Sequence, residues 1–228
     1  MIKPFLSVIV PVYNEDKTIA QVLKKLLSQK EVGEIIVVND GSTDASLKEI
    51  NKHKDKRIRI FSKENSGKGS AIRFGLQHVT GEYVMIQDAD LEYDPEDIPA
   101  LLEPVRKGKA QVIYGSRFLG PHLNLLFWHR VGNSLLNFLV NILYNTTLSD
   151  METCYKLMPT QLMKELDIRS NNFDIEPEIT CKVLKRGMFI YEVPISYVGR
   201  THLDGKKITW KDGFGAVKTI LKERFVHS

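Results

Sequence analysis

Short apolar runs alternate with segments whose apolar residues recur at helical spacing in the first half of the chain. The apolar runs predict strands at residues 6–10, 34–38, 57–61, 83–86 and 110–114. The helical patterns predict helices at residues 16–27, 45–52, 68–79 and 95–106. Strands and helices that alternate in this way form right-handed crossovers, so we expect an α/β fold with a mostly parallel central sheet.

The second half of the chain adds two amphipathic segments. Residues 131–149 carry no charge, but an amide recurs at every fourth position, at Asn133, Asn137, Asn141 and Asn145. Such a stripe is costly in lipid, so we expect a helix that lies at a membrane interface or packs on protein. Residues 210–225 combine aromatic and aliphatic positions with several cations. The two segments predict peripheral contact with a membrane surface, with packing on the core as the alternative and a membrane-anchored partner subunit as a further hypothesis.

Composition narrows the class of protein. A chain of 228 residues, 43% of them hydrophobic, is long enough for a single domain with a sizeable core. A net charge of +4 is too weak to indicate a nucleic-acid partner. The two cysteines, Cys154 and Cys181, have no metal spacing, and residues 1–4 lead directly into a strand without signal-peptide character. We therefore expect reduced thiols and a cytoplasmic location.

Two aspartates follow the strand predicted at residues 83–86. Asp88 and Asp90 are two positions apart, so strand periodicity points both side chains the same way, and Glu92 continues this spacing. Oxygen ligands of this kind favour a hard divalent cation, Mg²⁺ or Mn²⁺, held largely through the phosphates of a substrate. The motif therefore predicts a metal site for a phosphate-bearing ligand.

The acidic character of this region is local. Six acidic residues fall between Asp88 and Asp97 in a chain whose net charge is positive. Three of them have a simpler explanation, because Asp94 can cap a helix that begins at Pro95, with Glu96 and Asp97 in its first turn. Only the first part of the run is therefore a metal candidate.

Other polar segments follow the remaining strands, where ligands bind in parallel sheets. Residues 11–15 follow the first strand and residues 39–44 the second, where Asp40 can accept hydrogen bonds from a nucleotide base. Residues 65–69 place Lys68 between two glycines at the start of a helix, a weak phosphate-binding signal. Ordinary turn and capping chemistry explains each segment equally well when it is taken alone.

Taken together, these segments resemble the family 2 glycosyltransferases of the GT-A fold. The motifs that carry the resemblance are PVYNE at 11–15, NDGSTD at 39–44, GKG at 67–69 and DAD at 88–90. Three later motifs resemble the branch of polyprenyl-phosphate sugar transferases, which includes dolichyl-phosphate mannose and glucose synthases. They are GSRF at 115–118, SDMETCYK at 149–156 and FDIE at 173–176. The resemblance covers nearly the whole chain and implies a Rossmann-like single domain.

The resemblance implies roles for individual residues. The donor nucleotide would contact Pro11, Tyr13, Glu15, Asp40, Lys68, Asp88 and Ala89. The metal on the diphosphate would be held by Asp88 and Asp90, and less surely by Glu92. The phosphates of donor and acceptor would face Arg117, Arg200 and Lys206, with residues 200–207 closing over the donor. Residues 1–118 would thus bind nucleotide sugar and metal, and residues 119–228 the acceptor.

The reaction that the resemblance implies is transfer of a hexose from a nucleoside diphosphate to a polyprenyl or dolichyl phosphate. A lipid phosphate is already an anion and attacks without a base, but two anionic substrates require fixed cations. The available cations are Arg117, Arg130, Arg200, Lys206 and Lys207. A saccharide hydroxyl as acceptor would instead need Asp150 or Glu152 as general base. A non-catalytic sugar-nucleotide-binding adaptor is the alternative of another class. For the donor, the motif at 149–156 favours UDP-glucose slightly over GDP-mannose.

Overall fold

The structure is a computed structural model that describes residues 4–123, 126–200 and 210–226. Its main sheet consists of β1 (Leu6–Val12), β2 (Val32–Asp40), β3 (Ile58–Lys63), β4 (Tyr83–Ile86), β5 (Val112–Ser116), β7 (Lys156–Pro159) and β8 (Ile190–Pro194). The strand order in this sheet is β3-β2-β1-β4-β7-β5-β8. A separate pair is formed by β6 (His122–Leu123) and β9 (Tyr197–Val198).

The sheet is mostly parallel, as the alternating pattern predicts. The pairs β1–β2, β2–β3, β1–β4 and β5–β8 are parallel, while β7 is antiparallel to both of its neighbours. Strand β7 was not predicted, because it begins with a buried lysine, Lys156, and ends at Pro159, so it contains only two apolar residues in a row. Its insertion between β4 and β5 joins the two halves of the chain within one sheet.

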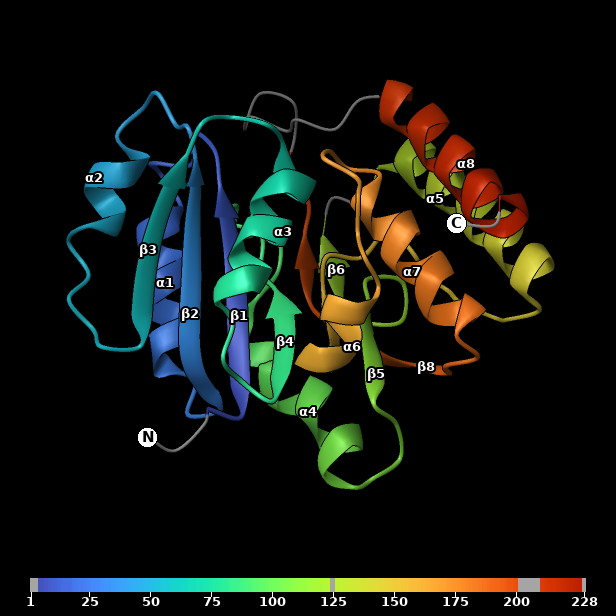
Figure 1. Ribbon diagram of the computed structural model, residues 1–228, viewed down its shortest axis with the longest axis horizontal. Coiled ribbons are helices and arrows are strands. Elements are labelled where there is room, and N and C mark those ends of the chain that lie inside the picture. The colour runs from blue at the N-terminus through green and yellow to red at the C-terminus, as the bar shows by residue number, and fades with distance from the viewer. Residues whose placement is uncertain (1–3, 124–125, 201–209, 227–228) are drawn as a thin grey trace.

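Helices cover both faces of the sheet. They are α1 (Ile19–Ser28), α2 (Ser46–Ile50), α3 (Lys68–His78), η1 (Pro95–Asp97), α4 (Ile98–Arg106), α5 (Phe127–Tyr144), α6 (Thr160–Glu165), α7 (Ile175–Lys185) and α8 (Trp210–Phe225). In Figure 1, α3 lies in front of the sheet and α1 behind it, while α5 and α8 lie side by side at one end. The predicted cap is confirmed, because the Asp94 side chain accepts a hydrogen bond from the Glu96 amide at 3.0 Å.

The core lies between the sheet and these helices. Strand β2 is buried at every position except Gly33, because it has helices on both faces. Helix α3 approaches the sheet closely at Gly75, where a Cβ atom would lie 2.8 Å from the Ile9 side chain. This packing fixes the position of the amino end of α3 relative to the ends of β1 and β2.

The amide stripe of the predicted uncharged helix faces the protein. The Asn137 side chain donates to the Ser149 carbonyl and accepts from the Met151 amide, and Asn141 exchanges two hydrogen bonds with the backbone of Leu148. The helix ends at Tyr144, earlier than the uncharged segment, because Asn145 adopts a left-handed conformation with φ of 50°. The amides therefore anchor α5 to the loop at residues 148–151.

The outer face of α5 is apolar and exposed. Leu135, Phe138 and Ile142 are 65%, 63% and 63% exposed, whereas Leu139 packs on a small cluster that joins α5, α7 and α8. Helix α5 therefore packs on the protein through one side, as the alternative of amphipathic packing predicts, and leaves a second apolar face exposed. Within the described residues, no helix combines the length and the apolar composition needed to cross a membrane.

The two hydrogen bonds of Asn137 make it a test of this packing. Because Asn137 is buried, we expect Asn137→Ala to leave two backbone groups unpaired and to lower the free energy of unfolding by about 1–3 kcal/mol. Urea denaturation measures this change. Asn133→Ala, on the same stripe, is the matched control and should cost less than about 0.5 kcal/mol. Equal losses in both variants would contradict the anchoring role.

Candidate active site

A cavity of about 1140 Å³ lies at the carboxyl edge of the sheet. Its walls come from the loop after β1, the ends of β2 and β4, and helices α5 and α8. Among the predicted site residues, it is lined by Pro11, Tyr13, Glu15, Asp40, Lys68, Asp88, Ala89, Asp90, Glu92, Arg117, Glu152 and Arg200. Asp150 lies behind Arg117, while Lys206 and Lys207 lie outside the described residues. The structure thus brings most of the predicted residues into one cavity.

Asp88 and Asp90 lie in the turn that follows β4, and each is paired with a cation. The Asp88 carboxylate lies 2.8 Å from Lys68 Nζ, and the Asp90 carboxylate lies 3.1 Å from Arg200 Nη2. Strand β4 ends at Ile86, before both aspartates, and Leu91 beyond them adopts a positive φ of 64°. The strand alternation expected from Asp88 to Glu92 is therefore wrong, although Asp88 lies close enough for its charge to act on Asp90.

Glu92 joins a distant segment to this turn. Its Oε2 accepts a hydrogen bond from the Tyr197 hydroxyl at 2.8 Å, and its Oε1 accepts one from the Arg200 amide at 2.7 Å. In the part of the chain that the structure describes, no group of three or more His, Cys, Asp or Glu side chains is arranged to hold a metal. Metal ligation by Glu92 stays a prediction, and its observed contacts position Arg200.

The electrostatics of this turn reflect crowded negative charge. Burial raises the pKa of Asp90 to about 7, and the charges of Asp88 and Glu92 act in the same direction. For Lys68, burial alone would lower the pKa, but the charges of Asp88 and Glu176 raise it well above its usual value. The ammonium of Lys68 therefore stays charged between two carboxylates.

Asp40, at the end of β2, holds the loop that precedes α3. Its carboxylate lies 2.7 Å from Lys63 Nζ and accepts a hydrogen bond from the Gly67 amide at 2.9 Å. Gly67 has a positive φ of 97°, and a Cβ there would clash with the backbone of Asn171. The glycine thus permits close contact with the backbone of Asn171, and it also lines the cavity. Recognition of a base by Asp40 stays a prediction.

Arg200 connects the two predicted donor-binding regions. Its guanidinium forms a bidentate ion pair with Glu15, at 2.9 and 3.1 Å, in addition to its contact with Asp90. Burial would lower the pKa of Arg200, but hydrogen bonding to Glu15 and the neighbouring carboxylates raise it. A fixed positive charge therefore lies beside Asp90 and Glu15, while contact of Arg200 with phosphate stays a prediction.

Arg117 is a second fixed cation in the wall of the cavity. Its Nε and Nη2 donate to the two oxygens of Asp150 at 2.8 and 2.7 Å. The rings of Tyr93, Tyr197 and Phe118 lie within 6.0 Å of the guanidinium carbon. Asp150 is fully buried and orients Arg117 from behind, so only Arg117 of this pair lines the cavity.

Arg130 lies farther out than the other predicted cations. It is exposed near the start of α5, and its guanidinium carbon lies 5.1 Å from the Phe118 ring centroid. It does not line the cavity. Its predicted role in the supply of phosphate-binding cations therefore has no support in the geometry.

Two glutamates lie deep in the cavity. Burial, together with the charge of Glu176, raises the pKa of Glu152 to about 8. Glu176, at the start of α7, lies 2.8 Å from Lys68 Nζ. The sequence contains Glu176 in the FDIE motif, but its pairing with Lys68 depends on a contact between residues 108 positions apart, for which no local pattern exists.

Comparison with known proteins agrees with this geometry. The model of the family "Glycosyl transferase family 2" matches residues 7–167. The low-salt glycan biosynthesis hexosyltransferase Agl6 of Haloferax volcanii is 30% identical and is matched over 96% of this chain and 54% of its own length. The undecaprenyl-phosphate 4-deoxy-4-formamido-L-arabinose transferase of Edwardsiella ictaluri is 28% identical over 89% of this chain and 62% of its own. The chain thus spans less than two thirds of these relatives.

A solved structure confirms the predicted GT-A fold. Glucosyl-3-phosphoglycerate synthase from Mycobacterium tuberculosis, in complex with Mn²⁺, UDP and glucosyl-3-phosphoglycerate, superposes with a TM-score of 0.76. The match covers 99% of this chain and 81% of that protein at 19% identity. The predicted enzyme class, a glycosyltransferase, is confirmed by the family match. The chain belongs to glycosyl transferase family 2.

Proposed function

We propose that the protein is a metal-dependent, inverting hexosyltransferase that acts on a nucleoside-diphosphate hexose and a polyprenyl or dolichyl phosphate. The observation that carries the proposal is the composition of the cavity. Its wall changes from the polar residues at the ends of β2 and β4 to the apolar residues of α5 and α8, such as Leu136 and Val217. A lipid phosphate has a charged head and an apolar tail, and it matches this change. The relative named for undecaprenyl phosphate supports the same acceptor class.

The metal would be held by Asp88 and Asp90. These two carboxylates offer the hard oxygen ligands that Mg²⁺ and Mn²⁺ prefer. Burial, and after it the charges of Asp88 and Glu92, raises the pKa of Asp90 to about 7, so a cation bound here would relieve an unfavourable buried charge. When bound, a divalent ion stabilises the charge that develops on the departing diphosphate. Glucosyl-3-phosphoglycerate synthase, which shares the fold, was solved with Mn²⁺ or Mg²⁺ and UDP.

The cations of the cavity suit a phosphate acceptor. Arg117 keeps its charge beside Asp150 and lines the same cavity as the acidic turn and the apolar residues of α5 and α8, so it is suited to bind the anionic head of a lipid. Arg200 would neutralise phosphate charge on the donor side. A phosphate oxygen attacks the anomeric carbon directly, so the protein supplies position and positive charge rather than a base.

A hydroxyl acceptor needs a general base, and neither Asp150 nor Glu152 is suited to that role. Both oxygens of Asp150 already accept hydrogen bonds from Arg117. Glu152, with a pKa raised to about 8, is mostly protonated at neutral pH and cannot accept a proton in that form. The intact pair of aspartates and the family match favour an enzyme over a non-catalytic sugar-nucleotide-binding adaptor.

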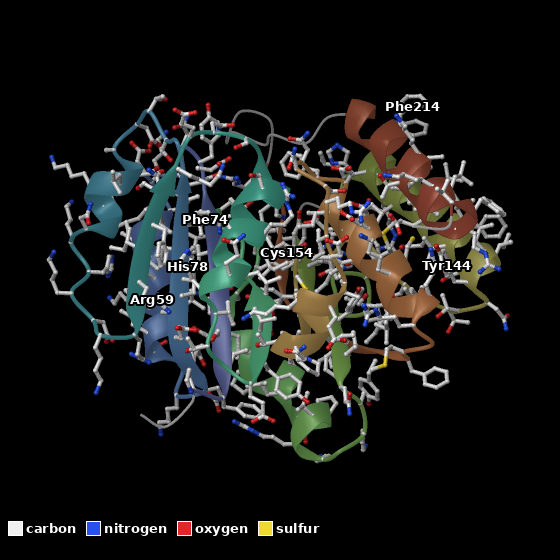
Figure 2. The ribbon with its side chains drawn as sticks, viewed as in Figure 1. Arg59, Phe74, His78, Tyr144, Cys154 and Phe214 are labelled. Carbon is white, nitrogen blue, oxygen red and sulfur yellow. The ribbon has the colours of Figure 1, made fainter. Side chains whose placement is uncertain are left out.

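We also propose that α5 and α8 lie on a membrane surface. Phe138 and Ile142 on α5 are more than half exposed, and so are Phe214 and Phe225 on α8. Figure 2 shows Phe214 at the surface near one end of α8. Exposed cations on α8, Lys218 and Lys222, suit contact with anionic lipid head groups. A peripheral enzyme in this orientation would take its acceptor from the bilayer, and a membrane-anchored partner subunit would strengthen the contact.

Proton competition at Asp90 predicts a pH dependence of metal binding. The carboxylate must lose its proton to bind a cation, so with a pKa of about 7 the Mn²⁺ affinity should be about tenfold weaker at pH 6 than at pH 8. Calorimetric titration of Mn²⁺ in the presence of UDP measures this. Asp90→Asn should remove both the tight binding and its pH dependence. The same affinity at both pH values would contradict the assignment of Asp90.

Transfer itself can be measured with labelled UDP-glucose and GDP-mannose, each with Mn²⁺ and a short-chain polyprenyl phosphate. We expect label in the organic phase from one donor, with UDP-glucose as the first candidate. Asp90→Asn should reduce the rate at least about 100-fold, because it removes charge that acts on the diphosphate. Asp94→Asn, in the same acidic run but outside the cavity, should keep the rate within about twofold. If the protein binds nucleotide but neither donor gives label in the organic phase, the proposed polyprenyl-phosphate acceptor is wrong.

The membrane proposal predicts binding to vesicles of phosphatidylcholine and phosphatidylglycerol. Phe138→Ser combined with Ile142→Ser should lower co-sedimentation at least about tenfold, because two apolar side chains no longer enter the interface. Phe189→Ser is the control, since Phe189 is 89% exposed but precedes β8 and is not part of α5 or α8. Equal binding by the double variant and the wild type would refute the assigned face.

A further inference from the structure

We infer that Glu152 and Glu176 form the subsite for the transferred sugar, and that this subsite selects a neutral hexose with free hydroxyls over a hexuronic acid. The inference rests on the proposed function, because it assumes that the cavity binds a nucleoside-diphosphate sugar. It adds two specificity-determining residues to the donor site. Both line the same cavity as Asp88 and Asp90.

Glu176 is a buried side chain with unused hydrogen-bonding capacity. It is 4% exposed, and its Oε1 lies 2.8 Å from Lys68 Nζ. Its Oε2 is buried and has no hydrogen-bond partner among the described residues, and the same holds for Glu152 Oε1. A buried acceptor without a partner is costly, so native proteins rarely keep two of them in one place without a function. Two such oxygens in the wall of one cavity indicate a hydrogen-bonding ligand.

The position of Glu176 identifies which part of the ligand it would meet. Lys68 Nζ lies 2.8 Å from Asp88 Oδ1 and also 2.8 Å from Glu176 Oε1. The carboxylate of Glu176 is therefore separated from a proposed diphosphate-metal ligand by a single ammonium group. The sugar of the donor is covalently bonded to that diphosphate, so its ring must lie within reach of groups at this distance. The nucleotide base would lie near Asp40, at the end of β2, whereas Asp88 follows β4.

The charges of the subsite define the class of sugar. Hydroxyl groups donate hydrogen bonds to carboxylate oxygens, and the protonated form of Glu152 can also donate one in return. Burial first, and then the charge of Glu176, holds the pKa of Glu152 near 8, so this form predominates at neutral pH. A hexuronate would place another carboxylate beside Asp88 and Glu176, where like charges repel. A neutral hexose satisfies the subsite without this repulsion.

The test compares binding of UDP and UDP-glucose by calorimetry in the presence of Mn²⁺, so it does not depend on the acceptor. In Glu176→Gln, which keeps the size of the side chain and a carbonyl for Lys68, UDP-glucose should bind about tenfold more weakly while UDP is unchanged within about twofold. Glu152→Ala should show the same pattern. Wild-type protein should bind UDP-glucuronate at least about tenfold more weakly than UDP-glucose.

Glu178→Gln provides the matched control. Glu178 is a buried glutamate on the same helix, but it pairs with Lys182 and does not line the cavity. It should leave the affinities for UDP and UDP-glucose unchanged, with thermal melts showing that all variants are folded. The same titrations with GDP, GDP-mannose and a GDP-hexuronate cover the other donor series.

The outcomes separate the inference from the function on which it rests. Equal weakening of UDP and UDP-glucose in Glu176→Gln would show that Glu176 acts only through Lys68 and the diphosphate, which overturns the sugar subsite. Unchanged affinities in both variants would overturn it as well, while the nucleotide-binding function stands. Tight binding of UDP-glucuronate would overturn the selection of a neutral sugar. Failure of wild-type protein to bind either nucleotide would overturn both proposals.

Discussion

Carboxylates buried at the carboxyl edge of the sheet need cations beside them, because an unpaired charge in a protein interior is strongly destabilising. This constraint connects segments that are distant in the chain. Lys68 on α3 pairs with Asp88 after β4 and with Glu176 on α7, and Arg200 pairs with Glu15 after β1. The cavity therefore cannot form until both halves of the chain have folded together. Its electrostatic field is built from fixed partners, which suits transfer between two anionic substrates.

Both halves of the chain contribute residues to the cavity. The first half contributes the strand ends and the aspartates, as the motifs imply. The second half contributes β7 between β4 and β5, the buried Asp150 that orients Arg117, and the helices that form the apolar part of the cavity. The expected division into residues 1–118 for the donor and residues 119–228 for the acceptor thus describes roles only. The main sheet contains strands from both parts.

Much of the fold could be predicted, because parallel strands buried on both faces produce apolar runs that stand out from the helical patterns between them. The strand-end residues Asp40, Asp88 and Asp90 could be placed for the same reason. Strand β7 and Glu176 could not, since Lys156 and Pro159 leave only two apolar residues in β7 and the role of Glu176 depends on distant partners. The orientation of α5 could not be predicted either, because an amide stripe is compatible with a helix at a membrane interface and with one packed on protein. The hydrogen bonds of Asn137 to the backbone of residues 149 and 151 show that the stripe faces the protein.

One cavity is proposed to hold the donor diphosphate and the head of a lipid phosphate whose tail lies along the cavity-lining residues of α5 and α8. Photo-cross-linking with a polyprenyl phosphate that carries a diazirine on its first isoprene units tests this most directly. The account predicts cross-links to cavity-lining residues of both helices, such as Trp128, Leu136 and Val217, that excess unlabelled polyprenyl phosphate removes. Cross-links that resist this competition, or that map only to surfaces outside the cavity, would contradict it.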